Sequence, residues 1–309
     1  MSTAERIAAI FPGQGAQSVG MLSELAANHA SIRLRFAEAS EVVGFDLWAM
    51  TEQGPSEVLG QTENTQPALL TASVALWDLW PGAQEKVAMM AGHSLGEYSA
   101  LVCAGAMSFT DGVALVRKRG ELMQAAVPNG QGTMAAVLGL DDEAIAQCCE
   151  QVAGEVSAAN YNAPGQVVIA GETDAVHAAI EACKAAGAKR AVPLDVSGPF
   201  HSRLMERAAD DFSEALSAIE LTLPEIPVYQ NVHGQVAGSV DEMRQLLVQQ
   251  LYSPVRWTTC VGALLDGGVG QFVECGPGSV LAGLVKRISR GTPTVGLSTA
   301  AGIEAAQAL

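Results

Sequence analysis

Charged and aromatic residues are scarce in this sequence, and each scarcity limits the class of protein it can encode. Charged residues make up 16% of the 309 residues and apolar residues 49%. This is the balance of a globular chain with a large core, not of a disordered one. The length suits one large domain with a smaller one attached, or two ordinary domains.

Long apolar runs are also absent. No stretch approaches the roughly 20 consecutive apolar residues of a membrane-spanning helix. The N-terminal segment lacks the basic start and the cleavage pattern of a signal peptide. We therefore expect a cytoplasmic protein without a membrane partner.

Basic residues are outnumbered, and the formal net charge of −16 argues against nucleic-acid binding. A local basic patch can still bind an anionic ligand. The candidates are residues 117–119, 189–190 and 286–287.

The six cysteines form no CxxC pair. Most stand in apolar segments, so we interpret them as reduced core residues. His93 and Glu97 have the spacing of half a metal site, but no second pair accompanies them. We therefore expect no metal.

Strand, tight turn and helix alternate along most of the chain. Strand signals occupy 6–11 and 87–94, and helical spacing of apolar residues marks 20–43, 65–80 and 95–105. This order predicts a parallel α/β sheet. Similar signals resume late in the chain, with helices at 202–219 and 240–252 and strands at 226–232 and 269–276.

Residues 130–198 instead follow the order βαββαβ of a ferredoxin-like domain. Thr173 is the expected N-cap of its second helix. We predict an α/β fold in which a large hydrolase-like domain with a central parallel sheet, residues 1–128 and 199–309, carries an inserted small ferredoxin-like subdomain, residues 129–198. The cleft between them is a usual place for a ligand.

Gly92-His93-Ser94-Leu95-Gly96 matches the G-x-S-x-G nucleophile elbow, whose glycines permit a tight turn from strand to helix. The turn exposes the Ser94 hydroxyl, and N–H groups at the helix start can receive an oxyanion. The alternative is a small-residue turn with a buried serine.

A serine nucleophile needs a base, usually a histidine. His93 directly precedes the nucleophile, so we expect it to point away and to be structural. Extending the 202–219 helix backward puts His201 on the apolar face, which makes it a candidate base or a core histidine. The other histidines show no catalytic pattern: His29, His177 and His233.

Arg119 lies on the apolar stripe of its helix, together with Leu115, Val116, Leu122 and Met123. An inward guanidinium needs an anion. A substrate carboxylate would satisfy it through a two-pronged bond. An internal ion pair or a surface position are the alternatives.

The glycine-rich loop 11–17 lacks the Lys-Ser/Thr of a P-loop and the third glycine of a dinucleotide fingerprint, so we reject a nucleotide site. In serine enzymes such a loop often donates the second oxyanion-hole N–H.

Six ordered motifs between about residue 9 and residue 290 together resemble one family. They are FPGQGAQ, GHSLGEYSALVCAG, RKRGELM, NAPGQVVIAG, SGPFHS and QLYSPVRW. This set resembles the malonyl-CoA:acyl carrier protein transacylases of bacterial fatty-acid synthesis.

The resemblance implies a role for each motif residue. Ser94 would be the acylated nucleophile and His201 its general base. The backbone N–H groups of Gln14 and Leu95 would form the oxyanion hole, and Arg119 would bind the malonyl carboxylate.

Further roles follow from the same resemblance. The backbone carbonyl of Gln250 would orient His201 in place of a triad acid, although Asp195 remains possible. Asn162 would lie in a turn beside the cleft and bind the substrate. Phe200 would restrict the space near the malonyl α-carbon.

The implied reaction is ping-pong transfer of malonyl from malonyl-CoA to acyl carrier protein. The thioester is a substrate, so no cofactor is expected, and we expect a monomer. The carrier would dock on Lys189, Arg190, Lys286 and Arg287. The rivals are a serine hydrolase and a non-catalytic carrier-binding module.

Overall fold

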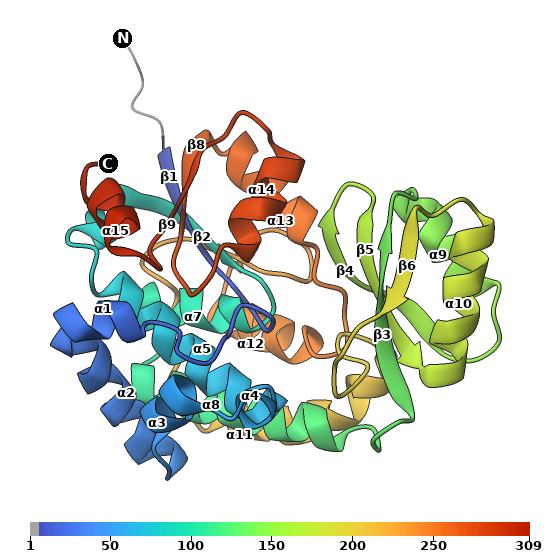
Figure 1. Ribbon diagram of the computed structural model, residues 1–309, viewed down its shortest axis with the longest axis horizontal. Coiled ribbons are helices and arrows are strands. Elements are labelled where there is room, and N and C mark those ends of the chain that lie inside the picture. Colours follow the sequence, from blue (N-terminus) through green and yellow to red (C-terminus); the bar gives the residue numbers. More distant parts are fainter. Residues whose placement is uncertain (1–5) are drawn as a thin grey trace.

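The computed structural model describes residues 6–309, so the first five residues of the predicted large domain lie outside it. The chain forms two sheets (Figure 1). One is parallel, with the strand order β7-β2-β1-β8-β9, and the other is antiparallel, with the order β4-β5-β3-β6. The predicted fold class is confirmed.

The parallel sheet is built from strands that are far apart in the chain. Its strands are β1 (Arg6–Phe11), β2 (Val87–Gly92), β7 (Val228–Tyr229), β8 (Val269–Glu274) and β9 (Thr294–Gly296). The helices before β2 are α1 (Ser23–Asn28), α2 (Ala30–Val43), α3 (Leu47–Gln53), α4 (Ser56–Leu59), α5 (Thr62–Trp77) and α6 (Ala83–Lys86). The other helices around it are α7 (Leu95–Cys103), α8 (Phe109–Ala125), η1 (Arg203–Ala208), α11 (Ala209–Ser217), α12 (Val240–Gln249), α13 (Trp257–Asp266), α14 (Val280–Ile288) and α15 (Ala300–Gln307).

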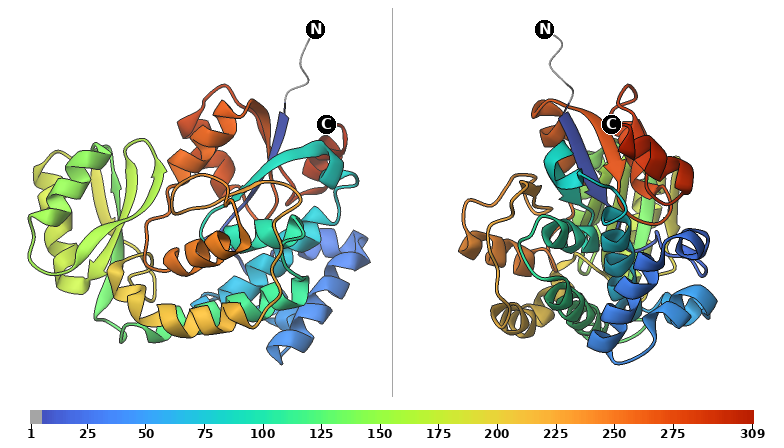
Figure 2. Two further views of the ribbon diagram at one scale, coloured as in Figure 1. Left: turned by 180° about the vertical axis from the view of Figure 1, so that it is seen from behind. Right: turned by 90° about the vertical axis from the view of Figure 1, so that its left-hand side faces the viewer.

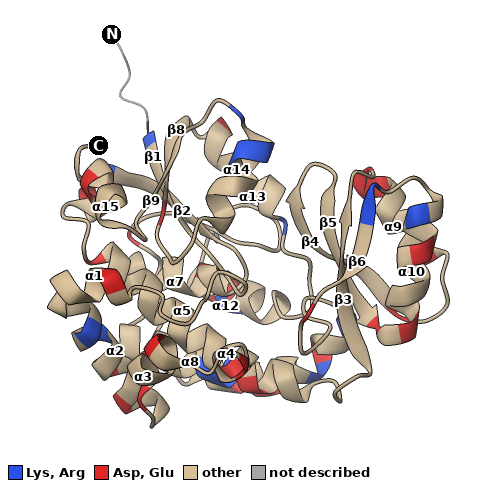
Figure 3. Ribbon diagram, in the orientation of Figure 1, with Lys and Arg blue, Asp and Glu red and all other residues tan. Residues whose placement is uncertain are grey.

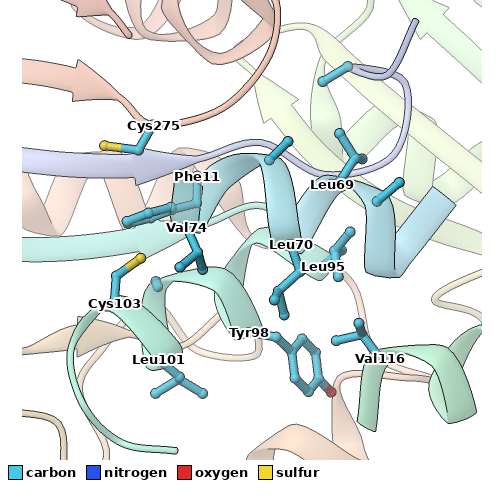
Figure 4. Packing of buried hydrophobic residues seen from close by; sticks show 14 of the residues in the cluster. Phe11, Leu69, Leu70, Val74, Leu95, Tyr98, Leu101, Cys103, Val116 and Cys275 are labelled. Atoms are coloured by element: carbon cyan, nitrogen blue, oxygen red, sulfur yellow. The ribbon is translucent and has the colours of Figure 1, made fainter. Parts of the chain in front are cut away.

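Both faces of β1 are buried, which explains why its sequence is apolar without a polar alternation. Ala9 and Phe11 face the core formed with α5 and α7, whereas Ala8 and Ile10 face the core formed with α13 and α14. This division follows from the two-residue period of a strand. Figure 4 shows Phe11 above α7, with the Tyr98 ring on the far side of that helix.

The antiparallel sheet lies within the segment 129–198 that we predicted as the small subdomain. Its elements are β3 (Gly132–Leu138), α9 (Asp142–Glu150), β4 (Val156–Ala163), β5 (Gln166–Glu172), α10 (Thr173–Ala185) and β6 (Arg190–Pro193). The first strand pairs antiparallel with the third and the fourth, as in a ferredoxin-like sheet. Figure 2 shows it from behind as a separate layer with α9 and α10 on its outer face.

The small sheet is hydrogen-bonded to the larger body through the backbone of Val255, which lies in neither sheet and stands two residues before α13. The N–H of Tyr161 donates to the Val255 carbonyl at 2.9 Å, and the N–H of Val255 donates to the Ala159 carbonyl at 2.8 Å. Strand β4 therefore continues the small sheet up to the larger body, where α13 begins.

Three expected elements differ from the structure. The predicted helix 20–43 is two helices, because His29 adopts an extended conformation between them. The predicted helix 202–219 begins as the 3₁₀ turn η1. The predicted strand 226–232 shrinks to β7, because the chain turns back and Gln230 donates to the Gln235 carbonyl.

The predicted N-cap is also wrong. Glu172 occupies the N-cap position of α10, without a side-chain cap. The hydroxyl of Thr173 instead donates to the Gly130 carbonyl at 2.8 Å, which ties the helix start to the loop before β3.

All six cysteines are buried and free, as expected of core residues. Within residues 6–309, no group of three or more potential metal ligands occurs. Of the helices in this range, none combines the length and the apolarity that a bilayer crossing needs.

Two glycines determine how closely β1, β2 and α7 approach. A Cβ atom on Gly92 would lie 1.8 Å from the Gly96 carbonyl carbon, and one on Gly96 would lie 1.9 Å from the Phe11 carbonyl oxygen. Both obstacles are backbone atoms, which no rotamer change can move. The G-x-S-x-G spacing is therefore a packing requirement of this turn.

We expect Gly96→Ala to lower the free energy of unfolding by about 2–3 kcal/mol or more, because the methyl group overlaps the β1 backbone. Urea denaturation of the variant checks this. Gly262→Ala is the matched control, because its Cβ would have no neighbour within 4 Å and the residue lies inside α13. That change should raise stability by about 0.5–1 kcal/mol. Similar losses for both variants would contradict the packing argument.

Candidate active site

Ser94 stands at the turn between β2 and α7, at the carboxyl end of the parallel sheet. Its backbone has φ 53° and ψ −109°, a conformation that an L-residue adopts only at a cost of about 1–3 kcal/mol. Strain of this kind is typical of a nucleophile elbow. The turn places the Ser94 hydroxyl in a cavity rather than in the core.

The imidazole of His201 lies against this hydroxyl. Its Nε2 atom is 2.7 Å from Ser94 Oγ, and its Nδ1 atom is 2.8 Å from the backbone carbonyl oxygen of Gln250. A carbonyl can only accept, so Nδ1 carries the proton and Nε2 is free to accept from the serine. Asp195 is exposed, and the position that a triad acid would take is held by Gln250.

The surroundings of His201 keep the ring neutral. Burial, the larger cause, and the charge of Arg119 lower the pKa of His201 to about 3. A neutral imidazole is the form that can take a proton. The ring is therefore ready to act as a base across the physiological pH range.

Arg119 reaches the same place from α8. Its side chain is 1% exposed. It donates to Gln66 Oε1 at 2.8 Å, to Gln250 Oε1 at 2.9 Å and to Ser94 Oγ at 3.2 Å. Its guanidinium carbon lies 5.1 Å from the centre of the Tyr98 ring.

Neither alternative position of Arg119 occurs. The residue is not on the surface, and none of the ion pairs within residues 6–309 includes it. Its Nε atom has no hydrogen-bond partner in the same range. A buried cation whose neighbours are amides and a hydroxyl is suited to binding a carboxylate.

A single cavity joins these groups. Its lining residues are Gln14, Gln66, His93, Ser94, Leu95, Arg119, Met123, Met134, Asn160, Leu194, Val196, Phe200 and His201. Residues of β3 and β4 and of the segment after β6 form one wall, so both sheets contribute. The predicted Ser94, His201 and Arg119 thus meet at one opening.

Gln14 and Leu95 both line this cavity. Leu95 is the first residue of α7, so its N–H is among those that a helix leaves without an intrahelical partner. The N–H of Ser94 itself is occupied, since it donates to Asn231 Oδ1 at 2.7 Å. This geometry leaves the Leu95 N–H, rather than that of Ser94, for a substrate oxygen.

Phe200 and Asn162 occupy different positions relative to the cavity. Phe200 is buried and belongs to the lining, next to His201. Asn162 lies in β4, not in the predicted turn, and it is not in the lining; its Oδ1 lies 2.7 Å from His93 Nε2. His93 has this structural contact, as expected, and it also lines the cavity.

Several buried polar residues of the site were missed by the sequence reasoning. Gln66 sits in the apolar helix α5, Glu97 is the one charged residue of α7, and Asn231 follows β7. All three are at most 2% exposed. The single charge in α7 was an available signal for Glu97, whereas Gln66 directly follows the polar residues 62–65 of α5 and, like Asn231, gave none.

The chain matches the model of the acyl transferase domain over residues 9–303. It is 55% identical to the malonyl CoA-acyl carrier protein transacylase of Salmonella typhimurium, with 92% of this chain and 93% of the relative covered. The Bacillus subtilis protein of the same name is 46% identical, with 97% and 96% covered.

Solved structures agree with these relatives. A malonyl-CoA:acyl carrier protein transacylase from Xanthomonas oryzae superimposes with a TM-score of 0.96 at 49% identity, covering 99% of this chain and 98% of that one. A malonyl-transacylase in complex with its type II PKS acyl-carrier protein gives 0.95 at 50% identity, covering 98% and 99%. This chain therefore belongs to the malonyl CoA-acyl carrier protein transacylase family.

Proposed function

We propose that this protein moves a malonyl group from malonyl-CoA to the thiol of an acyl carrier protein, through an ester on Ser94. The observation that supports the proposal is that one cavity contains both a hydrogen-bonded serine–histidine pair and a buried arginine that forms no ion pair with a carboxylate. The family membership and the names of the relatives support the same substrates.

The first half-reaction starts at the Ser94 hydroxyl. His201 Nε2 takes the hydroxyl proton as the oxygen attacks the malonyl thioester carbon. The N–H groups of Gln14 and Leu95 stabilise the oxyanion, and one such donor contributes roughly 3–4 kcal/mol. The C–S bond then breaks, the coenzyme A sulfur takes the proton from His201, and the malonyl ester remains.

The second half-reaction reverses these steps with another thiol. The carrier-protein thiol gives its proton to His201 and attacks the ester, and Ser94 leaves with that proton. Because coenzyme A departs before the carrier reacts, the mechanism is ping-pong. The Gln250 carbonyl keeps the proton on Nδ1 in place throughout. The other ring nitrogen, Nε2, therefore serves first as the base and then as the acid.

Arg119 determines which acyl group the site accepts. Its Nη2 atom donates to Ser94 Oγ at 3.2 Å, so a malonyl carboxylate can bind the guanidinium while the thioester carbon lies at the serine. An acetyl group would leave the guanidinium buried and unmatched, a loss worth a factor of about 10⁴–10⁵ in comparable enzymes. Phe200, in the wall beside His201, restricts the space at the α-carbon.

A serine hydrolase remains the main rival, because it would use the same nucleophile and base. The two activities differ in the fate of the acyl-enzyme, which water clears in a hydrolase and a thiol clears in a transferase. A binding module without catalysis has no need of the Ser94–His201 contact.

The carrier must approach a chain with a net charge of −16, so we place its docking at the basic residues Lys189, Arg190, Lys286 and Arg287. Strand pairing and one side-chain hydrogen bond connect Arg190 with Arg287, so these basic residues lie on neighbouring elements. Arg190 pairs with Leu138, and Leu138 pairs with Gln166, whose side chain accepts from Arg287. Figure 3 shows basic segments on β6 and on α14, with β4 and β5 between these two elements.

We also expect the enzyme to act as a cytoplasmic monomer. The six free, buried cysteines fit a reducing compartment.

Incubation with malonyl-CoA should add the mass of one malonyl group to the intact protein. Ser94→Ala should abolish the adduct, and addition of carrier protein with its thiol arm should remove it from the wild type. Rapid loss of the adduct in buffer alone would identify a hydrolase instead.

Arg119→Ala should lower malonyl transfer by about 10⁴-fold and acetyl transfer far less, because only the malonyl group carries a carboxylate for the guanidinium. Steady-state rates with both thioesters measure the ratio. Arg117→Ala is the control, since this arginine of the same helix contacts Glu121 and Asn64 outside the cavity. Equal losses with both thioesters would remove Arg119 from substrate choice.

Reversing the charge at Lys189 and Lys286 together should raise the KM for the carrier by about tenfold, because it weakens attraction to an acidic partner. Release of coenzyme A in the first half-reaction should not change. Arg33→Glu on α2, which is exposed and lies on the opposite side of the large body, serves as the control. An unchanged carrier KM would place the docking surface elsewhere.

A further inference from the structure

A buried carboxylate lies directly beneath the nucleophile turn. Glu97 is completely buried, three residues after Ser94 in the first turn of α7. Its Oε2 atom accepts the backbone N–H of Asn231 at 2.7 Å and the side-chain amide of Gln250 at 2.9 Å. The proposed reaction uses none of these contacts, although a buried glutamate is rare unless its charge is matched.

The two partners of Glu97 hold the main chain of Ser94 from both sides. Asn231 Oδ1 accepts the Ser94 N–H at 2.7 Å, and its Nδ2 donates to the Gly92 carbonyl at 2.7 Å. Gln250 Nε2 donates to the Ser94 carbonyl at 3.1 Å. The strained residue is thus fixed by two side chains that are both fully buried.

Glu97 also determines which way the Gln250 amide faces. The amide oxygen accepts from Arg119 at 2.9 Å, and the amide nitrogen faces only acceptors: the Glu97 carboxylate, the Ser94 carbonyl and, at 3.5 Å, Asn231 Oδ1. An amide with a cation at one end and an anion at the other has one favourable orientation. The cation and the anion are bridged by this amide instead of forming a direct ion pair.

Three neighbouring groups limit the cost of burying the Glu97 carboxylate. Burial raises the pKa of Glu97, the Asn231 N–H, the Gln250 amide and the charge of Arg119 oppose that rise, and the resulting pKa is about 7. The remaining oxygen, Oε1, has no partner within residues 6–309. All of the hydrogen bonding of the carboxylate is therefore directed at the two residues that hold Ser94.

We propose that Glu97 is a positioning residue for the nucleophile, whose carboxylate acts through Asn231 and Gln250 to hold the Ser94 main chain in the conformation that presents its hydroxyl to His201. The inference rests on the proposed function, because it assumes that Ser94 is acylated. Glu97 itself contacts neither the substrate nor the reacting atoms.

The test is the rate constant for acylation in a single turnover, followed by intact mass with malonyl-CoA and separately with acetyl-CoA. Glu97→Ala should lower this rate constant by about 10²-fold, the effect of a small displacement of a reacting group. The reduction should occur with both thioesters, because the nucleophile is common to both. Glu97→Gln keeps an oxygen acceptor and should stay within about tenfold of the wild type.

A purely structural role would give a different pattern. It would lower the fraction of protein that can be acylated and leave the rate constant of that fraction unchanged. Glu274→Gln is the matched control, because Glu274 is another fully buried carboxylate that accepts two N–H groups, those of Leu281 and Ala282 at the start of α14, away from Ser94. It should leave the acylation rate constant unchanged.

If Glu97→Ala does not fold, Glu97→Gln and Asn231→Ala still decide the matter. The effects of these two changes should be less than multiplicative in the double variant, because Glu97 acts partly through Asn231. Three results would overturn the inference: an unaltered rate constant in Glu97→Ala or, if that variant does not fold, in Asn231→Ala; a loss with malonyl-CoA alone; or fully multiplicative effects in the double variant. If the wild type forms no adduct, the proposed function itself fails.

Discussion

The turn at Ser94 depends on the absence of two side chains. Because Gly92 and Gly96 carry no Cβ, α7 passes within contact distance of the β1 and β2 backbones. The serine is thereby placed at the end of the sheet in a strained conformation. Everything else in the site is arranged around this one backbone geometry: His201 meets the hydroxyl from a turn after the small subdomain, and Arg119 meets it from α8.

A second constraint is the burial of opposite charges without an ion pair. The guanidinium of Arg119 and the carboxylate of Glu97 are both enclosed, yet the amide of Gln250 separates them. A direct salt bridge would pair the guanidinium of Arg119 with a carboxylate of the protein, and fewer of its N–H donors would then be available to a substrate carboxylate. Gln250 also orients His201 through its backbone, so one residue contacts His201, Arg119 and the main chain of Ser94.

The features of the site that could be predicted are those encoded by local sequence patterns. The elbow follows from G-x-S-x-G, and the inward position of Arg119 follows from helical periodicity. His201 was predicted to face inward by extending a helix, and it does so although that helix begins as a 3₁₀ turn and His201 has φ 60°. The partners of Arg119 could not be predicted in this way, since Gln66 and Gln250 lie 53 and 131 residues from it.

The sequence by itself determined the fold class, the position of the inserted small sheet and the tight strand-to-helix turn at Ser94, because each depends on periodicity or on residues close in the chain. Only the tertiary structure decided that Ser94 N–H is occupied by Asn231, that Glu97 lies beneath the elbow, and that His93 lines the cavity. These facts depend on contacts between distant segments. Such contacts are set by how the sheets and helices pack, which no local pattern records.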